Sequence, residues 1–184
     1  MQIFLDSDGV LADFDAFASS VLGMTLNQYE AAKHQPEGWD ILYAVEDFFF
    51  KLPKMRDADE LVQGVRDRGF EPIILTGVPS KDGSDWAIPQ KERWYEKHYP
   101  GTRVICCKSK DKVLHQVAGK HNVLIDDWKR HMKTWQNAGG TFILHKNAKQ
   151  SLAELDQVIE EQERESYRGY LQDKDNRNAD AATA

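Results

Sequence analysis

Five short apolar runs, each followed by a polar or charged stretch, constrain the fold of this 184-residue chain more than any other feature. They comprise residues 2–5, 72–75, 103–106, 122–125 and 141–144. Runs of this length and composition are typical of buried strands. Helical patterns separate the later runs, and strands that alternate with helices predict parallel β-α-β units. We therefore expect an α/β fold with a doubly wound parallel sheet.

The helices of this fold are predicted from the stretches between the runs. Residues 57–68 carry apolar side chains at helical spacing and end at Gly69, a residue typical of helix C-termini. After the fifth run, Ser151 and Glu154 form a capping-box pattern that predicts a C-terminal helix. Further helices are expected at residues 91–98, 112–118 and 129–138.

One connection is too long for a simple crossover. Residues 10–71 separate the first two runs, and the helix at 57–68 accounts only for the end of this stretch. Long loops without secondary structure are uncommon in compact domains. We therefore expect residues 14–54 to form a small helical cap, inserted after the first strand into a core of residues 1–13 and 55–165. The polar residues 166–184 are expected to be a flexible tail.

Composition excludes several classes of protein. The net charge of −6 argues against stable binding to nucleic acid. No apolar run approaches the length that spans a membrane, and no signal peptide is recognisable. The two cysteines, Cys106 and Cys107, are adjacent and form no disulfide framework or zinc motif. These features predict a cytoplasmic protein without a membrane partner.

Polar residues with chemical potential follow four of the five apolar runs. Asp6 and Asp8 follow the first, Thr76 and Gly77 the second, a group of lysines the third, and an Asp pair the fourth. The lysines are Lys108, Lys110 and Lys112, and the Asp pair is Asp126 and Asp127. Each group alone could be an ordinary turn or helix cap. Because ligands bind outside the carboxyl ends of the strands in such sheets, their joint placement predicts a reaction centre.

These residue types are suited to phosphoryl transfer. Carboxylates from two strands can hold Mg²⁺, which prefers oxygen ligands. One Asp can form an aspartyl-phosphate, while a second can protonate the leaving oxygen and later activate water. A Thr hydroxyl and a Lys ammonium can hold the oxygens of the phosphoryl group.

The order of these motifs resembles that of the haloacid-dehalogenase (HAD) superfamily of phosphotransferases, and most closely its 5′(3′)-deoxyribonucleotidases. The likeness extends from residue 3 to about residue 127. It is carried by Phe4-Leu5-Asp6-Ser7-Asp8-Gly9-Val10 and its continuation to Phe14, by Gly38-Trp39, Phe48-Phe49-Phe50-Lys51-Leu52, Lys91-Glu92-Arg93-Trp94, Lys110-Asp111-Lys112 and Leu124-Ile125-Asp126-Asp127.

The resemblance implies an activity and a role for each matching residue. The activity is that of a Mg²⁺-dependent phosphomonoester hydrolase acting through an aspartyl-phosphate, as a 5′-nucleotidase on (deoxy)ribonucleoside monophosphates. Asp6 would be the nucleophile and Asp8 the general acid and base. The implied ligands of Mg²⁺ are Asp6, the backbone carbonyl of Asp8, Asp126 and Asp127.

Substrate contacts are implied by the same resemblance. Thr76 and Lys112 would bind the phosphoryl group, and Phe14 and Trp39 would line a pocket for the base. Lys91 and Lys110 are further candidates on the phosphate side. Among the lysines we favour Lys112, because it would open a helix at the sheet edge, where amide groups also attract anions.

Two departures from the family are visible. The family has Thr-Ser where this chain has Thr76-Gly77, so one hydroxyl contact is missing and a backbone N–H is the expected replacement. The cap is also shorter than in the animal deoxyribonucleotidases, which leaves the choice of base and sugar open.

Three other functions could use some of the same residues. A HAD phosphatase for another small phosphate ester, such as a sugar phosphate or a nucleic-acid end, keeps the chemistry and changes the substrate. A phospho-accepting receiver module has similar residues, but its paired acids follow the first strand and its phosphorylated Asp the third, and it has no cap. A scaffold without catalysis is not favoured, since every acid that the chemistry needs is present. The expected partner is a small phosphorylated substrate. The sequence does not decide whether the protein forms a homodimer.

Overall fold

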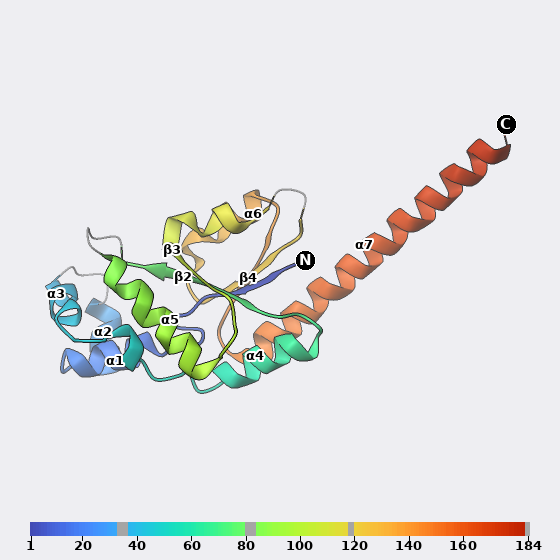
Figure 1. Ribbon diagram of the computed structural model, residues 1–184. Coiled ribbons are helices and arrows are strands. Elements are labelled where there is room, and N and C mark those ends of the chain that lie inside the picture. Colours follow the sequence, from blue (N-terminus) through green and yellow to red (C-terminus); the bar gives the residue numbers. More distant parts are fainter. Residues whose placement is uncertain (33–36, 80–83, 118–119, 183–184) are drawn as a thin grey trace.

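A five-stranded parallel sheet forms the centre of the molecule (Figure 1). The computed structural model describes residues 1–32, 37–79, 84–117 and 120–182. The strands are β1 (Ile3–Leu5), β2 (Ile73–Val78), β3 (Val104–Lys108), β4 (Val123–Asp126) and β5 (Thr141–Leu144). Their order in the sheet is β3-β2-β1-β4-β5, and every neighbouring pair is parallel. The predicted doubly wound α/β sheet is thus confirmed, with strand ends that differ from the predicted ones by a few residues.

The strand order places a switch point at the middle of the sheet. From β1 the chain adds β2 and β3 on one side, and then crosses over to add β4 and β5 on the other. Phe4 of β1 pairs with Ile73 of β2 on one side and with Leu124 of β4 on the other. Ligands of such sheets bind at the switch point, outside the carboxyl ends of the strands. Asp6 directly follows β1 and Asp126 ends β4, so both carboxylates lie at this point.

Helices connect the strands, and several begin or end at other residues than the pattern predicts. The helix expected at 112–118 is the 3-10 helix η3, with residue 118 outside the described residues, and the one at 129–138 divides into η4 and α6. The helical elements are α1 (Phe14–Val21), α2 (Leu26–Ala32), α3 (Glu37–Tyr43), η1 (Phe49–Lys51), α4 (Ala58–Asp67), η2 (Ser84–Trp86), α5 (Ala87–His98), η3 (Ser109–His115), η4 (Lys129–His131), α6 (Met132–Asn137) and α7 (Ala148–Ala182).

Alternate residues of each strand are buried on opposite faces of the sheet, as the two-residue period of a strand requires. Ile3 and Leu5 belong to the larger apolar cluster, together with side chains from α4, α5, α7 and the inserted helices. Phe4 belongs to a smaller cluster on the other face, where its ring meets Trp135 of α6 edge to face at 5.7 Å. Burial on both faces explains why the strands are continuous apolar runs.

The insertion after β1 is helical, as predicted, and contains α1, α2, α3 and η1. The two ends of the insertion lie side by side. The Asp13 amide donates to the Pro53 carbonyl, and the Met55 amide donates to the Leu11 carbonyl, both at 2.8 Å. Its aromatic residues pack mostly on one another. The ring of Phe48 lies within 5.2–5.4 Å of three other phenylalanine rings, those of Phe14, Phe17 and Phe49.

The end of the insertion is tied to α5 by three side chains of that helix. The Phe49 amide donates to Gln90 Oε1 at 2.9 Å, and Trp94 Nε1 donates to the Leu52 carbonyl at 2.7 Å. Arg93 pairs with Asp47 at 2.9 Å. Lys91 lies on the same helix and belongs to the site described below.

The first turns of α7 dock on α4. Gly64 permits this close contact, since a Cβ atom on it would lie 2.4 Å from Leu152 Cδ1. Arg68 adds a two-pronged ion pair with Asp156, with N···O distances of 2.6 and 2.7 Å. The helix therefore has both an apolar and a charged anchor at its N-terminal end.

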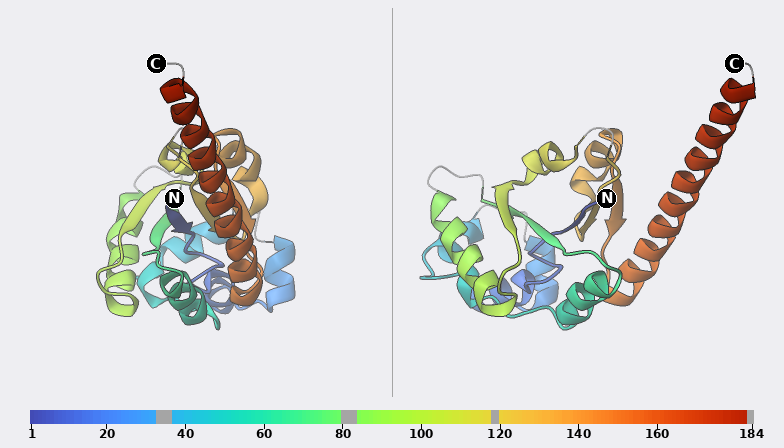
Figure 2. Two further views of the ribbon diagram at one scale, coloured as in Figure 1. Left: turned by 90° about the vertical axis from the view of Figure 1, so that its right-hand side faces the viewer. Right: turned by 45° about the vertical axis from the view of Figure 1, so that its right-hand side comes forward.

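Beyond this anchor, α7 projects away from the sheet (Figures 1 and 2). Residues 166–182 of the expected flexible tail belong to this helix, which continues to Ala182. Glutamate, arginine and alanine favour helix, and pairs four residues apart such as Arg164–Glu160 and Arg177–Asp173 support it. No helix in the described ranges is long and apolar enough to cross a membrane.

Candidate active site

A cavity of about 710 Å³ opens at the carboxyl ends of β1 and β4. This volume lies within the range of about 300–1,000 Å³ that is usual for ligand sites. Its floor contains the acids that follow the strands, and one part of its lining comes from the aromatic residues of the insertion. The floor residues are Asp6, Asp8, Lys112, Asp126 and Asp127, and the aromatic residues, called here the aromatic wall, are Phe14, Tyr29, Trp39, Tyr43 and Phe49.

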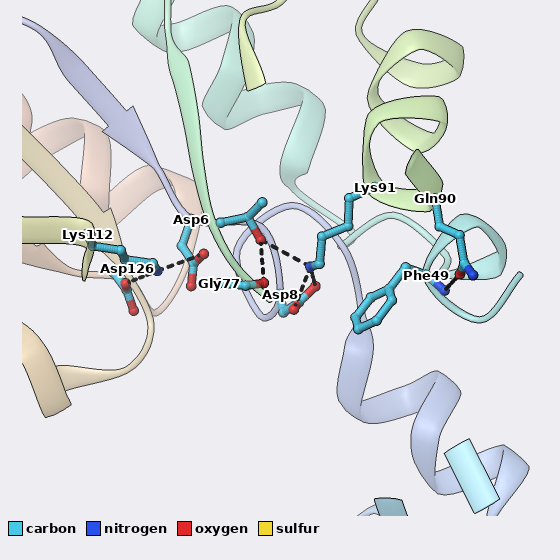
Figure 3. Close-up of polar contacts among 9 residues, drawn as sticks. Asp6, Asp8, Phe49, Gly77, Gln90, Lys91, Lys112 and Asp126 are labelled. Atoms are coloured by element: carbon cyan, nitrogen blue, oxygen red, sulfur yellow. Dashed lines mark hydrogen bonds and ion pairs between the residues drawn. The ribbon is translucent and has the colours of Figure 1, made fainter. Parts of the chain in front are cut away.

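Lys112 joins the first and fourth strands at the floor. Its ammonium lies 2.9 Å from Asp6 Oδ1 and 2.7 Å from Asp126 Oδ2 (Figure 3). Burial alone would lower the pKa of Lys112, but the two carboxylates outweigh it and raise that pKa. The lysine therefore stays charged and holds two carboxylates close together at the switch point.

The turn after β1 requires glycine at position 9. The Ser7 carbonyl accepts hydrogen bonds from the amides of Val10, Leu11 and Ala12, at 2.8–3.2 Å, and this coils the chain tightly. Gly9 has a φ of 81°, and a Cβ atom there would lie 2.2 Å from Asp127 Oδ2. A side chain at this position would collide with the second acid of the Asp pair.

A second buried lysine holds Asp8. Lys91 of α5 is 2% exposed, and its ammonium donates to both carboxylate oxygens of Asp8 at 2.8 Å and to Thr76 Oγ1 at 3.1 Å (Figure 3). It also lies 4.4 Å from the ring centroid of Phe49. Burial raises the pKa of Asp8, although the Lys91 charge opposes this rise. A raised pKa suits an acid that must carry a proton near neutral pH.

Thr76 and Lys91 do not belong to the lining of the cavity. The resemblance implies a place on the phosphate side for Thr76 and makes Lys91 a further candidate there. The Thr76 side chain is fully buried, and its hydroxyl accepts from Lys91 and donates to the Gly77 carbonyl at 3.3 Å. The two residues thus form a layer beneath the floor that orients Asp8.

Three carboxylates form a candidate metal centre. Oxygen atoms of Asp6, Asp126 and Asp127 lie within 4.8 Å of one another. Burial and the charges of Asp6 and Asp126 raise the pKa of Asp127 to about 7, and burial also raises that of Asp126. A bound cation would reverse both effects. The all-oxygen donor set fits a hard ion such as Mg²⁺; the Asp8 carboxylate is outside this set because it faces Lys91.

Ser109 is a cavity residue that the sequence reasoning missed. A Cβ atom on Gly77 would lie 2.3 Å from Ser109 Oγ, so the hydroxyl of Ser109 occupies the space that a side chain at position 77 would need. Both residues line the cavity, as does Lys110. Its position in the sequence could have predicted this place, because Ser109 directly follows the third strand and Gly77 lies at the end of the second.

The aromatic wall contains both residues predicted for it and three more. The rings of Phe14 and Trp39 lie 5.7 Å apart, and Tyr43 lies 5.5 Å from Trp39. Phe14 is largely buried at 8% exposure, whereas Trp39 is half-buried. Tyr29, Tyr43 and Phe49 were not predicted for the wall, because a cluster of aromatics does not itself reveal which members face the cavity.

Comparison with known proteins shows the fold. No protein-family model matches the sequence, and no curated protein is significantly similar to it. A hydrolase from Streptococcus pneumoniae is similar in structure, with a TM-score of 0.51, 16% identity, and coverage of 86% of this chain and 97% of that one. A HAD-superfamily hydrolase from Ehrlichia chaffeensis gives a TM-score of 0.50 and 14% identity over the same shares, 86% and 97%. The chain therefore has the α/β fold seen in hydrolases of the HAD superfamily.

Proposed function

We propose that this protein is a Mg²⁺-dependent phosphomonoester hydrolase that acts through an aspartyl-phosphate. The observation that carries the proposal is the placement of two Asp side chains in different settings, two residues apart. Asp6 is paired with Lys112 beside two further carboxylates, while Asp8 is held by Lys91 and has a raised pKa. Two acids in such different surroundings can take the separate roles of nucleophile and proton donor.

The two steps follow from these roles. An oxygen of Asp6 attacks phosphorus, the bond from phosphorus to the ester oxygen breaks, and Asp8 gives its proton to the departing alkoxide. Asp8 then takes a proton from water as the water oxygen bonds to phosphorus. The acyl-phosphate bond breaks, so that inorganic phosphate leaves and the Asp6 carboxylate is restored.

Mg²⁺ would be held by Asp6, Asp126, Asp127 and the carbonyl oxygen of Asp8, where it supplies positive charge that offsets the repulsion between carboxylates and phosphate. Lys112 remains beside Asp6 and adds its charge on the phosphoryl side. Ser109, Gly77 and the exposed Lys110 also line the cavity. Lys91 and Thr76 serve the reaction by orienting Asp8.

The aromatic wall favours a nucleoside monophosphate as the substrate. A base can stack on an exposed aromatic face, which is worth about 1–3 kcal/mol in proteins that bind single strands. Trp39 is half-buried and lines the same cavity as the acids, so a base could rest on it while the phosphate meets Asp6. A sugar phosphate has no base to stack on this wall.

The test is a screen of the purified protein against nucleoside monophosphates and sugar phosphates, with Mg²⁺ and with EDTA. We expect phosphate release from nucleoside monophosphates that stops in EDTA and returns with added Mg²⁺. Turnover of sugar phosphates alone would overturn the nucleotidase assignment and keep the phosphatase. No release from any ester would contradict both.

A further inference from the structure

A second part of the cavity lining carries aromatic and cationic side chains that the proposed reaction does not use. It consists of Trp128, Arg130 and His131, which follow the Asp pair, and Lys110 of η3. The elements η3 and η4 are in contact, so these four residues, called here the basic rim, lie on neighbouring segments. Trp128 is 44% exposed, which leaves much of its ring open to a ligand.

The rim is held in place by contacts of its own. The Trp128 amide donates to Asp126 Oδ1 at 2.8 Å, which ties the rim to the floor of the cavity. The Arg130 guanidinium lies 4.9 Å from the Trp128 ring centroid, and the His131 ring meets Trp128 edge to face at 6.1 Å. Stacking on an aromatic ring limits the freedom of the guanidinium without using its hydrogen-bond donors.

The charges of the rim lack acidic partners. Arg66, Arg68 and Arg93 each form an ion pair with a carboxylate. Within the described part of the chain, by contrast, no carboxylate pairs with Arg130 or Lys110. Two cations without a carboxylate partner at the edge of one cavity can attract an anion, even in a chain with a net charge of −6.

We propose that the basic rim binds a second phosphate group of the substrate, so that the preferred substrates are nucleotides with phosphates on two hydroxyls of one sugar. The inference rests on the proposed function, since the first phosphate must lie at Asp6. A guanidinium presents paired donors that match phosphate oxygens, and a second ammonium can share the charge. The second phosphate can be a free monoester, as in a nucleoside 3′,5′-bisphosphate, or the diester that links a following nucleotide.

The test compares the kcat/KM for three substrates: a nucleoside 5′-monophosphate, the corresponding 3′,5′-bisphosphate and a 5′-phosphorylated dinucleotide. The variants are Arg130→Gln and, as the control, Arg164→Gln, which removes the same charge from the exposed part of α7. We expect the wild type and the control to prefer at least one doubly phosphorylated substrate by about ten-fold or more, the usual worth of a charged hydrogen bond. In Arg130→Gln this preference should largely disappear.

Equilibrium binding separates this inference from the proposed function. Calorimetric titration of Asp6→Asn with the monophosphate, the bisphosphate and the 5′-phosphorylated dinucleotide, in Mg²⁺ buffer, measures the same preference without turnover. A wild type that hydrolyses no ester would overturn the proposed function, while the titration would still decide the rim. Equal affinities for all three ligands, or a preference that survives Arg130→Gln, would overturn the rim proposal. Whichever doubly phosphorylated substrate is preferred identifies the source of the second phosphate.

Discussion

The floor and the aromatic wall of the cavity are built in different ways. The floor is made of charges at strand ends, held by two buried lysines within 3.1 Å of their partners. The wall is made of rings on short inserted helices, 5.7 and 6.2 Å apart where Phe14 meets Trp39 and Phe49. Under the proposed function, charges fixed in a sheet edge would act on every phosphate ester, whereas rings would select among leaving groups. Changes to the floor should therefore lower kcat for all substrates, and changes to the wall should raise KM for some.

The largest effect is expected from Asp6→Asn. The amide cannot form the acyl-phosphate, so turnover should fall on the order of 10⁴-fold or more, by comparison with other covalent enzymes. Phosphate release measured in single turnover would show it, with circular dichroism to confirm folding. A variant that kept a tenth of the wild-type rate would refute the role of Asp6 as nucleophile. Beryllium fluoride, a mimic of aspartyl-phosphate, should inhibit the wild type.

The next largest effect is expected from Gly9→Ala. The new methyl group would displace Asp127, and misplacing a catalytic group by about 1 Å can lower the rate about a hundred-fold. Gly69→Ala is the matched control, since Gly69 has the same φ of 81° but no atom near its added Cβ. Both variants should lose about 1–2 kcal/mol of stability to backbone strain. If both lost activity equally, the contact with Asp127 would not matter.

A smaller effect is expected at the wall. Trp39→Ala should raise the KM for a nucleoside monophosphate by roughly ten- to a hundred-fold, the worth of one stacked base. Hydrolysis of p-nitrophenyl phosphate should hardly change, because it offers no base to the wall. Phe17→Ala, which removes a ring from the insertion outside the cavity lining, is the control for lost packing. Equal loss on both substrates, with a lower Tm, would make Trp39 a structural residue.

The smallest effect concerns stability and pH. The pKa of Asp127 is about 7 in the fold, above its usual value of 3.8, so the unfolded chain ionises first and stability should fall as pH rises between these values. Mg²⁺ binds the ionised form, so the rise in Tm that it causes should be larger at pH 8 than at pH 5.5. At a hundred-fold excess over Kd the gain is about 2.7 kcal/mol. Asp127→Asn should show a smaller rise at pH 8, and a rise that does not depend on pH would exclude Asp127 from the metal centre.

The sequence predicts more residues of the floor than of the aromatic wall, for a physical reason. Asp6, Thr76 and Asp126 follow apolar runs, and parallel strands bring their carboxyl ends to one edge whatever the loops do. The orientation of Phe49 or Tyr43 depends instead on how short helices pack, which no local pattern encodes. The inserted segment was thus predicted as helical, but not which of its rings line the cavity.

The two lysines show the same limit within the floor. Lys112 was favoured for its place at the sheet edge, and it lies beside Asp6. Lys91 was only a further candidate for the phosphate side, and its contact with Asp8 could not be predicted, because the position of its helix depends on distant packing. The C-terminal segment was predicted as a tail from its polarity, but helix propensity and pairs four residues apart suffice to keep it helical.

The three bonds from α5 to the end of the insertion give the site a mechanical property. The same helix carries Lys91, which holds Asp8, and Gln90, which accepts from the Phe49 amide of the wall (Figure 3). A displacement of η1 must therefore carry α5 with it or break these bonds. Phe49 of the wall and Lys91, which holds Asp8, are therefore linked through one helix, so a shift of the wall would be felt at Asp8.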